Sequence, residues 1–303
     1  MRLVPAPALV LTGVISVQVG NAWAATLFAR VGAGGAGFMR LAWAMLILML
    51  AYRPVLRGRR REEWLPALGL GLVLAALNMS FYHAIVHLPL GVAVTVEFIG
   101  PMAVAVAHSR RPRDLAWILL AIAGVVALAN GGGHHSSLLG LGFAAAAGAC
   151  WGAYILLQAR VGRAFSDGSG LALAMLVAAL AALPDGMIEG GSKLLAPGVL
   201  EIGAAVGLLS SVIPYSIELG VLRRMSPGVF GVLMSMEPAV AAGAGGIVLG
   251  QGLAAREVVG MALVSAASLG TSLFGADRGA VPPELLGAAS AGQSAGPPPS
   301  HDV

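Results

Sequence analysis

The chain has 303 residues, of which 58% are hydrophobic and only 11% are charged, and its formal net charge is +4 at pH 7. A soluble globular domain carries about 25% charged and roughly 45–50% apolar residues. Together with a mean hydropathy of +0.87, these values place the chain in the membrane class. One cysteine, Cys150, excludes an intramolecular disulfide. No CxxC, HExxH, Walker-type or GxSxG motif occurs, so we expect no enzyme, no bound metal and no cofactor.

Ten apolar runs qualify as candidate transmembrane helices, which need about 20 mostly apolar residues. They cover residues 8–29, 36–52, 65–86, 89–108, 114–130, 138–158, 168–184, 199–220, 227–249 and 255–274. The start of the chain is also compatible with a cleaved signal peptide. Gln18 and Asn21 within the first run, and the nine runs after it, favour a retained span. Residues 276–303 are rich in Pro, Gly and Ser, which predicts a disordered tail.

The basic residues predict how the chain is oriented. Fourteen of the 18 lysines and arginines lie at the termini or in the connections that follow the second, fourth, sixth and eighth runs. Cytoplasmic connections carry such an excess of positive charge. We therefore expect ten spans in the inner (plasma) membrane with both termini and the tail in the cytoplasm. Because membrane orientation accounts for the distribution of the basic residues, the net positive charge is no evidence for a nucleic-acid partner, and we expect none.

Two pairs of similar segments predict an internal repeat. The sequence ARVG occurs at 29–32 and again at 159–162, and GVAVTVEFIGP (91–101) aligns with GVFGVLMSMEP (228–238). In both pairs the second copy follows the first after a similar number of residues, so we expect two halves of five spans each. Because five is odd, the second half enters the membrane from the opposite side. Such inverted repeats are common in transporters, whose binding sites lie near the midplane between the halves.

The polar residues inside the runs gather in the first, third and fourth runs and in the sixth, eighth and ninth. Intramembrane polar groups are costly in lipid and tend to face a cavity. These six runs correspond under the repeat, which predicts a central cavity. Arg40, at the start of the second run, is expected to extend to the membrane interface instead. The candidates for substrate binding or proton coupling are Gln18, Asn21, Asn78, Tyr82, His83, Glu97, Trp151, Tyr154, Tyr215, Glu218 and Glu237.

Glu97 and Glu237 are the strongest of these candidates. Glu97 lies eight residues after Pro89 and Glu237 ten residues after Pro227, which is about 12 Å and about 15 Å along a helix. Both therefore fall near mid-membrane, where burial favours the neutral form of a carboxyl group. Such a group can bind a proton in one state and a substrate ammonium in another. The alternative is a neutral glutamic acid that only connects two helices by hydrogen bonds.

Pro101 and Pro238 follow the two glutamates in the aligned segments. A proline within a helix frees the carbonyl four residues earlier, which predicts kinks that either serve transport or are merely tolerated. Glu97 precedes its proline by four residues and Glu237 by one, so the glutamates are not strict equivalents. We expect Glu97 to carry the proton and Glu237 to contact the substrate or position its helix.

The remaining candidates have structural alternatives. Glu218 could instead form an ion pair with Arg223 or Arg224. His83 could instead be a packing residue that forms hydrogen bonds with its neighbours. The aromatic residues Tyr82, Trp151, Tyr154 and Tyr215 wall a cation site or serve packing alone.

Four segments resemble the drug/metabolite transporter superfamily, and more narrowly EamA-type carriers of the threonine/homoserine exporter group. They are LPLGVAVTVEFIGPMAVAVAHSRRPRD, GACWGAYILLQARVG, SVIPYSIELGVLRR and FGVLMSMEPAVAAG. The resemblance spans roughly residues 10 to 275. The chain departs from the group in His83, in the His134–His135 pair and in the long tail, which leaves the exact substrate open.

The resemblance implies an all-α polytopic membrane protein with ten transmembrane helices, arranged as two inverted five-helix EamA repeats around a central cavity. The repeats would be residues 1–130 and 131–275. It also implies export of small amino acids such as threonine or homoserine, by proton antiport with alternating access. The residues that match the family's motifs are Glu97, Pro101, Tyr215, Glu218, Glu237 and Pro238.

Other functions remain open at this point. The transported solute could be another small metabolite, such as a purine or an aromatic amino acid, or a drug-like cation. A membrane sensor or scaffold that transports nothing is a different class, but it has no reason to bury two mid-membrane carboxylates. An intramembrane enzyme would need a nucleophile and a base, and only a serine near His83 offers that combination. The partners expected are protons, a small-molecule substrate and the lipid bilayer, and the sequence assigns no oligomeric state.

Overall fold

The computed structural model describes residues 5–54, 61–107, 114–129, 137–165, 168–215, 217 and 227–275. Every regular element in these ranges is a helix. In the same ranges, seven helices are long and apolar enough to span a membrane: Ala6–Ala25, Phe28–Tyr52, Trp64–His87, Leu138–Ala164, Ser169–Leu195, Pro197–Tyr215 and Val229–Leu249. The predicted all-α, multi-pass membrane class is therefore confirmed.

The remaining predicted spans correspond to shorter or more polar helices. Two are the shorter apolar helices Leu90–Val104 and Ala116–Ala129, and the third is the final helix, Ala255–Gly275. The predicted tail, and the histidine pair at 134–135, lie outside the described residues.

The described elements follow one another in this order. The first part holds α1 (Ala6–Ala25), α2 (Phe28–Tyr52), α3 (Arg61–His87), α4 (Leu90–Glu97), α5 (Ile99–Ala107) and α6 (Asp114–Ala129). The second part holds α7 (Leu138–Ala164), α8 (Ser169–Gly190), the 3₁₀ turn η1 (Gly191–Leu195), α9 (Pro197–Gly207), the π-helical turn η2 (Leu208–Val212), α11 (Pro227–Met234), α12 (Glu237–Leu249) and α13 (Ala255–Gly275).

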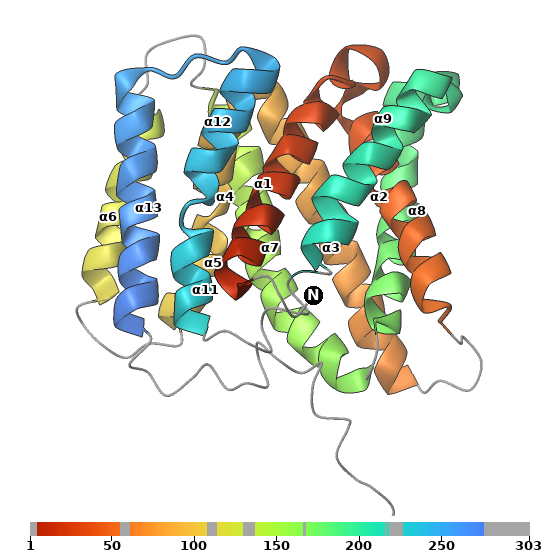
Figure 1. The fold of residues 1–303 in the computed structure, drawn as a ribbon, viewed down its shortest axis with the longest axis horizontal. Coiled ribbons are helices and arrows are strands. Elements are labelled where there is room, and N and C mark those ends of the chain that lie inside the picture. Colours follow the sequence, from red (N-terminus) through yellow and green to blue (C-terminus); the bar gives the residue numbers. More distant parts are fainter. Residues whose placement is uncertain are drawn as a thin grey trace, which may run out of the picture.

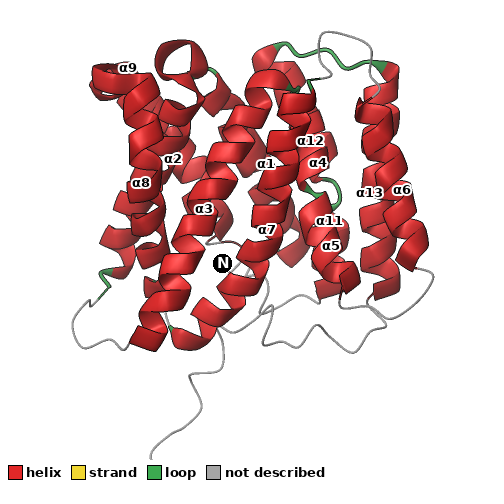
Figure 2. Cartoon of the chain, turned by 180° about the vertical axis from the view of Figure 1, so that it is seen from behind, coloured by secondary structure: helices red, strands yellow, loops and turns green. Residues whose placement is uncertain are grey.

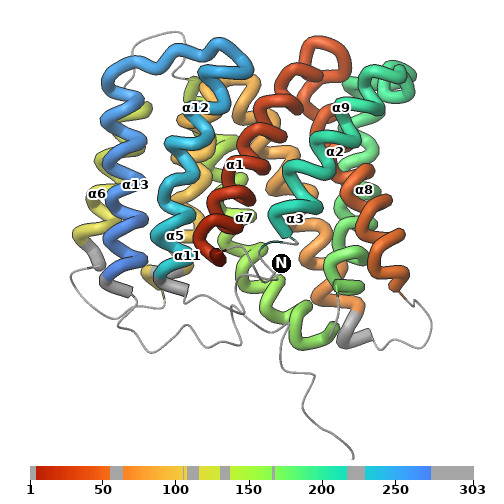
Figure 3. The backbone as a smooth tube through the Cα atoms, in the orientation of Figure 1, coloured from red at the N-terminus to blue at the C-terminus, as the bar shows by residue number. Residues whose placement is uncertain are grey.

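The helices form one bundle in which successive spans run in opposite directions (Figure 1). α2 packs on α8 at one edge and α6 on α13 at the other (Figure 1). On one face α1 lies between α12 and α9 (Figure 3). On the reverse face α3 packs along α7 (Figure 2). We refer below to the upper end of the bundle in Figure 1, where α3 and α8 end, and to the lower end, where α2 ends.

The boundary between the first two helices differs from the prediction. We expected a break at 30–35; α1 ends earlier, at Ala25, and α2 begins at Phe28 with a short segment that a kink at Gly32, inside the expected range, separates from the rest of the helix. Gly32, with φ of 71° and ψ of 177°, forms the kink, and the rest of the glycine-rich segment at 33–37 is helical. Glycine tolerates positive φ, and the lack of side chains lets this segment approach α8, since a Cβ on Gly34 would lie 2.6 Å from Asp185.

Two spans are interrupted near their middle. The first changes from α4 to α5 at Phe98, and the second from α11 to α12 at Ser235 and Met236. Pro101 lies three residues after the first break, and Pro238 lies in the first turn of α12. A proline has no backbone N–H, so the carbonyl four residues before it loses its helical donor. These carbonyls belong to Glu97 and Met234, the last residues of α4 and α11, so each helix breaks directly after the carbonyl that its proline frees.

Glycines let the interrupted spans approach their neighbours. A Cβ on Gly91 of α4 would lie 2.9 Å from the Cα of Ala242 in α12. A Cβ on Gly148 of α7 would lie 2.7 Å from the carbonyl oxygen of Glu97, and a Cβ on Gly100 would collide with the carbonyl of Gly148. Small residues at such crossings are typical of membrane helix packing, and here they hold Glu97 against the centre of α7.

We predict that Gly148→Ala destabilises the protein whereas Gly142→Ala, in the same helix, does not. The added methyl group at 148 meets a backbone carbonyl, while nothing lies within 4 Å of a Cβ at 142. Overpacking of this kind costs about 1–3 kcal/mol, whereas alanine in an open helical position is favourable by roughly 0.5–1 kcal/mol. Unfolding in detergent micelles measures both. Equal stabilities for the two variants would contradict this close approach of α7 to α4.

Candidate functional site

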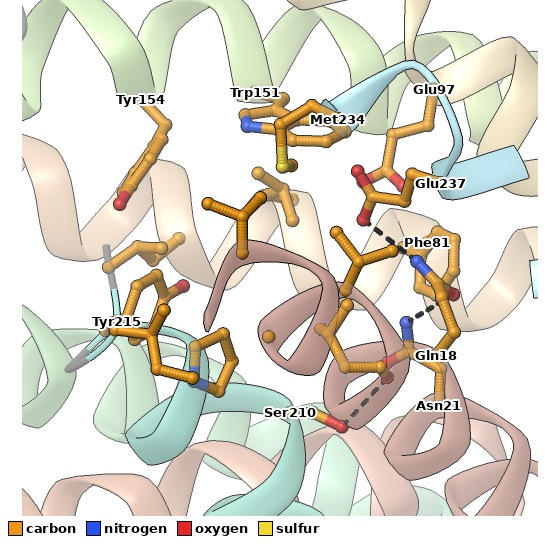
Figure 4. Close-up of a pocket in the computed structure, with 18 of the residues that line it drawn as sticks. Gln18, Asn21, Phe81, Glu97, Trp151, Tyr154, Ser210, Tyr215, Met234 and Glu237 are labelled. Atoms are coloured by element: carbon orange, nitrogen blue, oxygen red, sulfur yellow. Dashed lines mark hydrogen bonds between the residues drawn. The ribbon is translucent and has the colours of Figure 1, made fainter. Parts of the chain in front are cut away.

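A cavity of about 110 Å³ lies in the bundle between α1, α3, α4, α7, the α9–η2 segment and the α11–α12 span. These are the six spans in which the sequence places the polar candidates, joined by Arg40 of α2. Seven of the predicted residues line the cavity: Gln18, Asn21, Glu97, Trp151, Tyr154, Tyr215 and Glu237. Ten of the lining residues are labelled in Figure 4.

Glu97 and Glu237 come together at the inner ends of two half-helices. Glu97 is the last residue of α4 and Glu237 the first of α12. Gly91 and Ala242 mark where the two helices touch, six and five residues away from the glutamates, or about 9 Å and about 8 Å. The two carboxyl groups therefore reach the same level, where they interact electrostatically, and Figure 4 shows the two side chains pointing toward one another. Both glutamates are buried, with 7% and 5% of their surface exposed.

A chain of hydrogen bonds connects Arg40 to Glu237 through α1. The Arg40 Nη1 group donates to Asn21 Oδ1 at 3.0 Å. Asn21 Nδ2 in turn donates to Gln18 Oε1 at 3.4 Å, and Gln18 Nε2 donates to Glu237 Oε1 at 2.9 Å (Figure 4). Each amide accepts on one side and donates on the other, so the chain has a fixed direction from the cation to the carboxylate.

Arg40 itself is held by two further hydrogen bonds. Its Nη2 donates to the carbonyl oxygen of Ser210 at 2.7 Å and its Nε donates to Ser211 Oγ at 3.1 Å. The guanidinium also lies 5.9 Å from the centre of the Tyr82 ring, within the range of a cation–π interaction. The expectation that Arg40 reaches the membrane interface is therefore wrong, since its side chain is buried in the middle of the protein.

The error about Arg40 follows from the boundary of α2. α2 is kinked at Gly32, and Arg40 lies eight residues after the kink and twelve residues before Tyr52, or about 12 Å and about 18 Å along the helix axis. No arginine side chain spans either distance. The sequence offered the relevant signal, because an arginine inside a long apolar helix is an intramembrane charge and hence a functional candidate.

The π-helical turn η2 supplies the acceptors for Arg40. Ser16 Oγ of α1 donates to the carbonyl of Leu209 at 2.8 Å, and a Cβ on Gly20 would collide with the Ser210 hydroxyl. α1 therefore lies directly on this turn. π-Helical turns are frequent at functional sites, and here the turn directs the Ser210 carbonyl and the Ser211 hydroxyl toward α2.

Tyr154 and Tyr215 lie on the side of the cavity opposite the hydrogen-bond chain, and Trp151 lies between them and Glu97 (Figure 4). The rings of Tyr154 and Tyr215 are 6.4 Å apart between their centres. Trp151 packs edge-on against Phe98, at 5.5 Å and 83°. A small solute in the cavity therefore has charged and amide groups on one side and aromatic faces on the other.

Three predicted residues lie outside the cavity lining, and one is not described. Tyr82 is fully buried beneath Arg40. Asn78 donates to the carbonyl of Leu74 in its own helix at 2.8 Å. His83 contacts Asp185 of α8 at 3.1 Å. Glu218 lies outside the described residues.

Comparisons with known proteins identify the group to which the chain is similar. Residues 138–273 match the model of the EamA-like transporter family. The threonine/homoserine exporter RhtA of Salmonella typhimurium strain LT2 is 41% identical over 260 residues, which cover 85% of this chain and 88% of the relative. That of Escherichia coli K12 is 40% identical over 267 residues, covering 88% and 90%.

One solved crystal structure shares the fold. It matches at a TM-score of 0.54 with 18% sequence identity, covering 88% of this chain and 99% of that protein. The curated relatives are named as exporters, which confirms the expectation that the chain is not an enzyme.

We predict that Arg40→Lys lowers stability and that Arg30→Lys in the same helix does not. Lysine keeps the charge but lacks the planar fork that donates to Asn21, Ser210 and Ser211 at once. Hydrogen bonds from a charged donor are worth about 1.5–3 kcal/mol, whereas Arg30 is exposed. Detergent unfolding of the two variants gives the comparison. An unchanged midpoint for Arg40→Lys would contradict the described environment of Arg40.

Proposed function

The chain belongs to the EamA-like transporter family, and on that premise we propose that it is a secondary transporter that exports a small neutral amino acid. Threonine and homoserine are the favoured substrates because the curated relatives are named as exporters of these compounds. The observation that carries the proposal is a small cavity lined by both a buried arginine and a buried glutamate pair.

The charges of the cavity match those of an amino acid. The carboxylate of the substrate binds Arg40, since the guanidinium group recognises carboxylates, and the ammonium group binds Glu237. The volume of about 110 Å³ is smaller than the about 300–1,000 Å³ of sites for drug-sized ligands. Size and charge therefore both favour a small zwitterion over a drug-like cation.

Glu97 is our candidate for the proton carrier. Glu237 begins α12, where the helix dipole stabilises a negative charge, while Glu97 ends α4, where the dipole opposes one. Glu97 and Glu237 also repel one another when both are charged. Proton antiport follows if Glu97 is protonated in the empty carrier and releases its proton when the substrate ammonium enters.

The packing pattern supports ten spans in two inverted repeats, residues 1–130 and 131–275. α2 packs on α8, α6 on α13 and α4 on α12, and each pair joins corresponding spans of the two halves. The contact of α3 with α7 likewise corresponds to the contact of α9 and η2 with α1. If each span is replaced by the corresponding span of the other half, these helix contacts therefore map onto one another.

Alternating access accounts for the position of the cavity. Its lining reaches toward the lower end through Val10, Ile217 and Phe230. Toward the upper end a core of buried apolar residues, among them Leu27 and Leu90, packs above it. We assign the lower end to the cytoplasmic side of an inner membrane, because α2 ends there and the arginines that follow α2 in the sequence fit the excess of positive charge on that side. The structure then corresponds to a state sealed on the outside.

We predict that proteoliposomes with an acidic interior accumulate labelled threonine, and that a protonophore abolishes the accumulation. Glu97→Gln should reduce gradient-driven accumulation at least tenfold, because glutamine cannot exchange a proton. Glu201→Gln, in an exposed position of α9, is the matched control and should behave as wild type. If Glu97→Gln still accumulates threonine with the same pH dependence, Glu97 does not carry the proton.

We also predict that homoserine competes with labelled threonine and that threoninol, which lacks the carboxylate, competes at least tenfold more weakly. The contrast tests Arg40 as the carboxylate-binding group. Equal competition by threoninol, or efflux of a dye cation such as ethidium in place of amino acids, would overturn the proposed substrate class.

A further inference from the structure

Three side chains able to bind a metal ion meet near the upper end of the bundle. His83 comes from α3, and Asp185 and Glu189 come from α8; their ligand atoms all lie within 4.8 Å of one another. His83 Nε2 is 3.1 Å from Asp185 Oδ2. None of the three lines the central cavity, so the cluster is separate from the proposed substrate site.

The geometry of this cluster is fixed by its surroundings. Asp185 and Glu189 are four residues apart and so share one face of α8. Glu189 Oε2 accepts the backbone N–H of Gly34 at 2.7 Å. The His83 ring stacks on Phe143, at 5.4 Å and 29°. Such outer contacts orient metal ligands in known sites.

The charges of the cluster favour a cation. Among the described residues, His83 is the only basic side chain in an ion pair with either carboxylate. Two carboxylates held close together repel one another, and a divalent ion would offset that repulsion. The side chains of His83 and Asp185 are 27% and 37% exposed, so an ion in the water at the upper end can reach them.

We propose that His83, Asp185 and Glu189 form a binding site for a zinc-like divalent cation. One imidazole and two carboxylates, with a water molecule completing the sphere, suit zinc at ligand distances of about 2.0–2.2 Å. Ligand atoms around such an ion lie about 3.3–3.6 Å apart. The 3.1 Å between His83 Nε2 and Asp185 Oδ2 lies just below this range, and a pair of ligand atoms as far apart as 4.8 Å would need to approach by about 1 Å.

The bound ion joins α3 to α8, which belong to different repeats. This consequence rests on the proposed function, because alternating access requires the two halves to move relative to one another. An ion that bridges the two halves would fix them in one relative position. Zinc added on the outer side therefore slows transport.

Metal titration of the purified protein tests the site itself. The experiment uses full-length protein in detergent with its affinity tag removed and with His134→Ala and His135→Ala as background, which eliminates two other histidines. Zinc calorimetry should give one saturable site, and cobalt should give the visible absorption of a low-coordinate complex. His83→Ala and Asp185→Asn should each weaken binding at least tenfold, while His87→Ala, on the same helix but outside the cluster, should not.

Melting curves establish that each variant is folded before it is titrated. Zinc binding that survives both His83→Ala and Asp185→Asn, or no saturable binding to the folded protein, overturns the site. Transport is then measured as the ratio of rates with and without external zinc for each variant. Wild type should slow at least fivefold at saturation and His83→Ala should be insensitive.

The outcomes separate the two proposals. Binding without inhibition overturns the bridging role and retains the site. Failure to transport threonine in the absence of zinc contradicts the proposed function and leaves the titration valid.

Discussion

The central constraint on this fold is the buried charge of Arg40. It lies halfway along a membrane-spanning helix, where an unsatisfied cation would cost many kcal/mol. Three guanidinium hydrogen bonds, to Asn21, Ser210 and Ser211, and the face of Tyr82 offset that cost. The polar residues of α1 and the π-helical turn η2 are explained by this requirement. The chain from Arg40 to Glu237 then places opposite charges on one small cavity.

Interrupted helices bring the two glutamates to that cavity. A continuous helix would leave Glu97 and Glu237 within regular turns. The breaks instead place one at the C-terminal end of α4 and the other at the N-terminal end of α12. Because the helix ends have opposite dipoles, two chemically identical side chains acquire different electrostatic environments. The same half-helices touch through Gly91, so relative movement of α4 and α12 would alter the distance between the carboxyl groups.

Much of the architecture was predictable from the sequence because membrane helices have a strong compositional signal. Apolar length and sparse charge predicted an all-helical membrane protein, and polar residues in six spans predicted which spans line the cavity. Boundaries were predicted less well, because glycine in 32–37 resembles a loop in sequence but serves helix contact in the fold. With the helix expected to start at residue 36, Arg40 fell near the membrane edge, whereas the helix extends back to the kink at Gly32 and places Arg40 deeper.

The sequence by itself determined the membrane class, the identity of the cavity-lining spans and the position of Glu97 and Glu237 within their spans, because these depend on composition and on position along the helix. Only the tertiary structure decided which partners meet. It joined Arg40 to Asn21 and directed His83 away from the cavity toward Asp185. Hydrogen bonds between helices depend on the rotation and crossing of each helix, which glycine contacts distant in the chain fix.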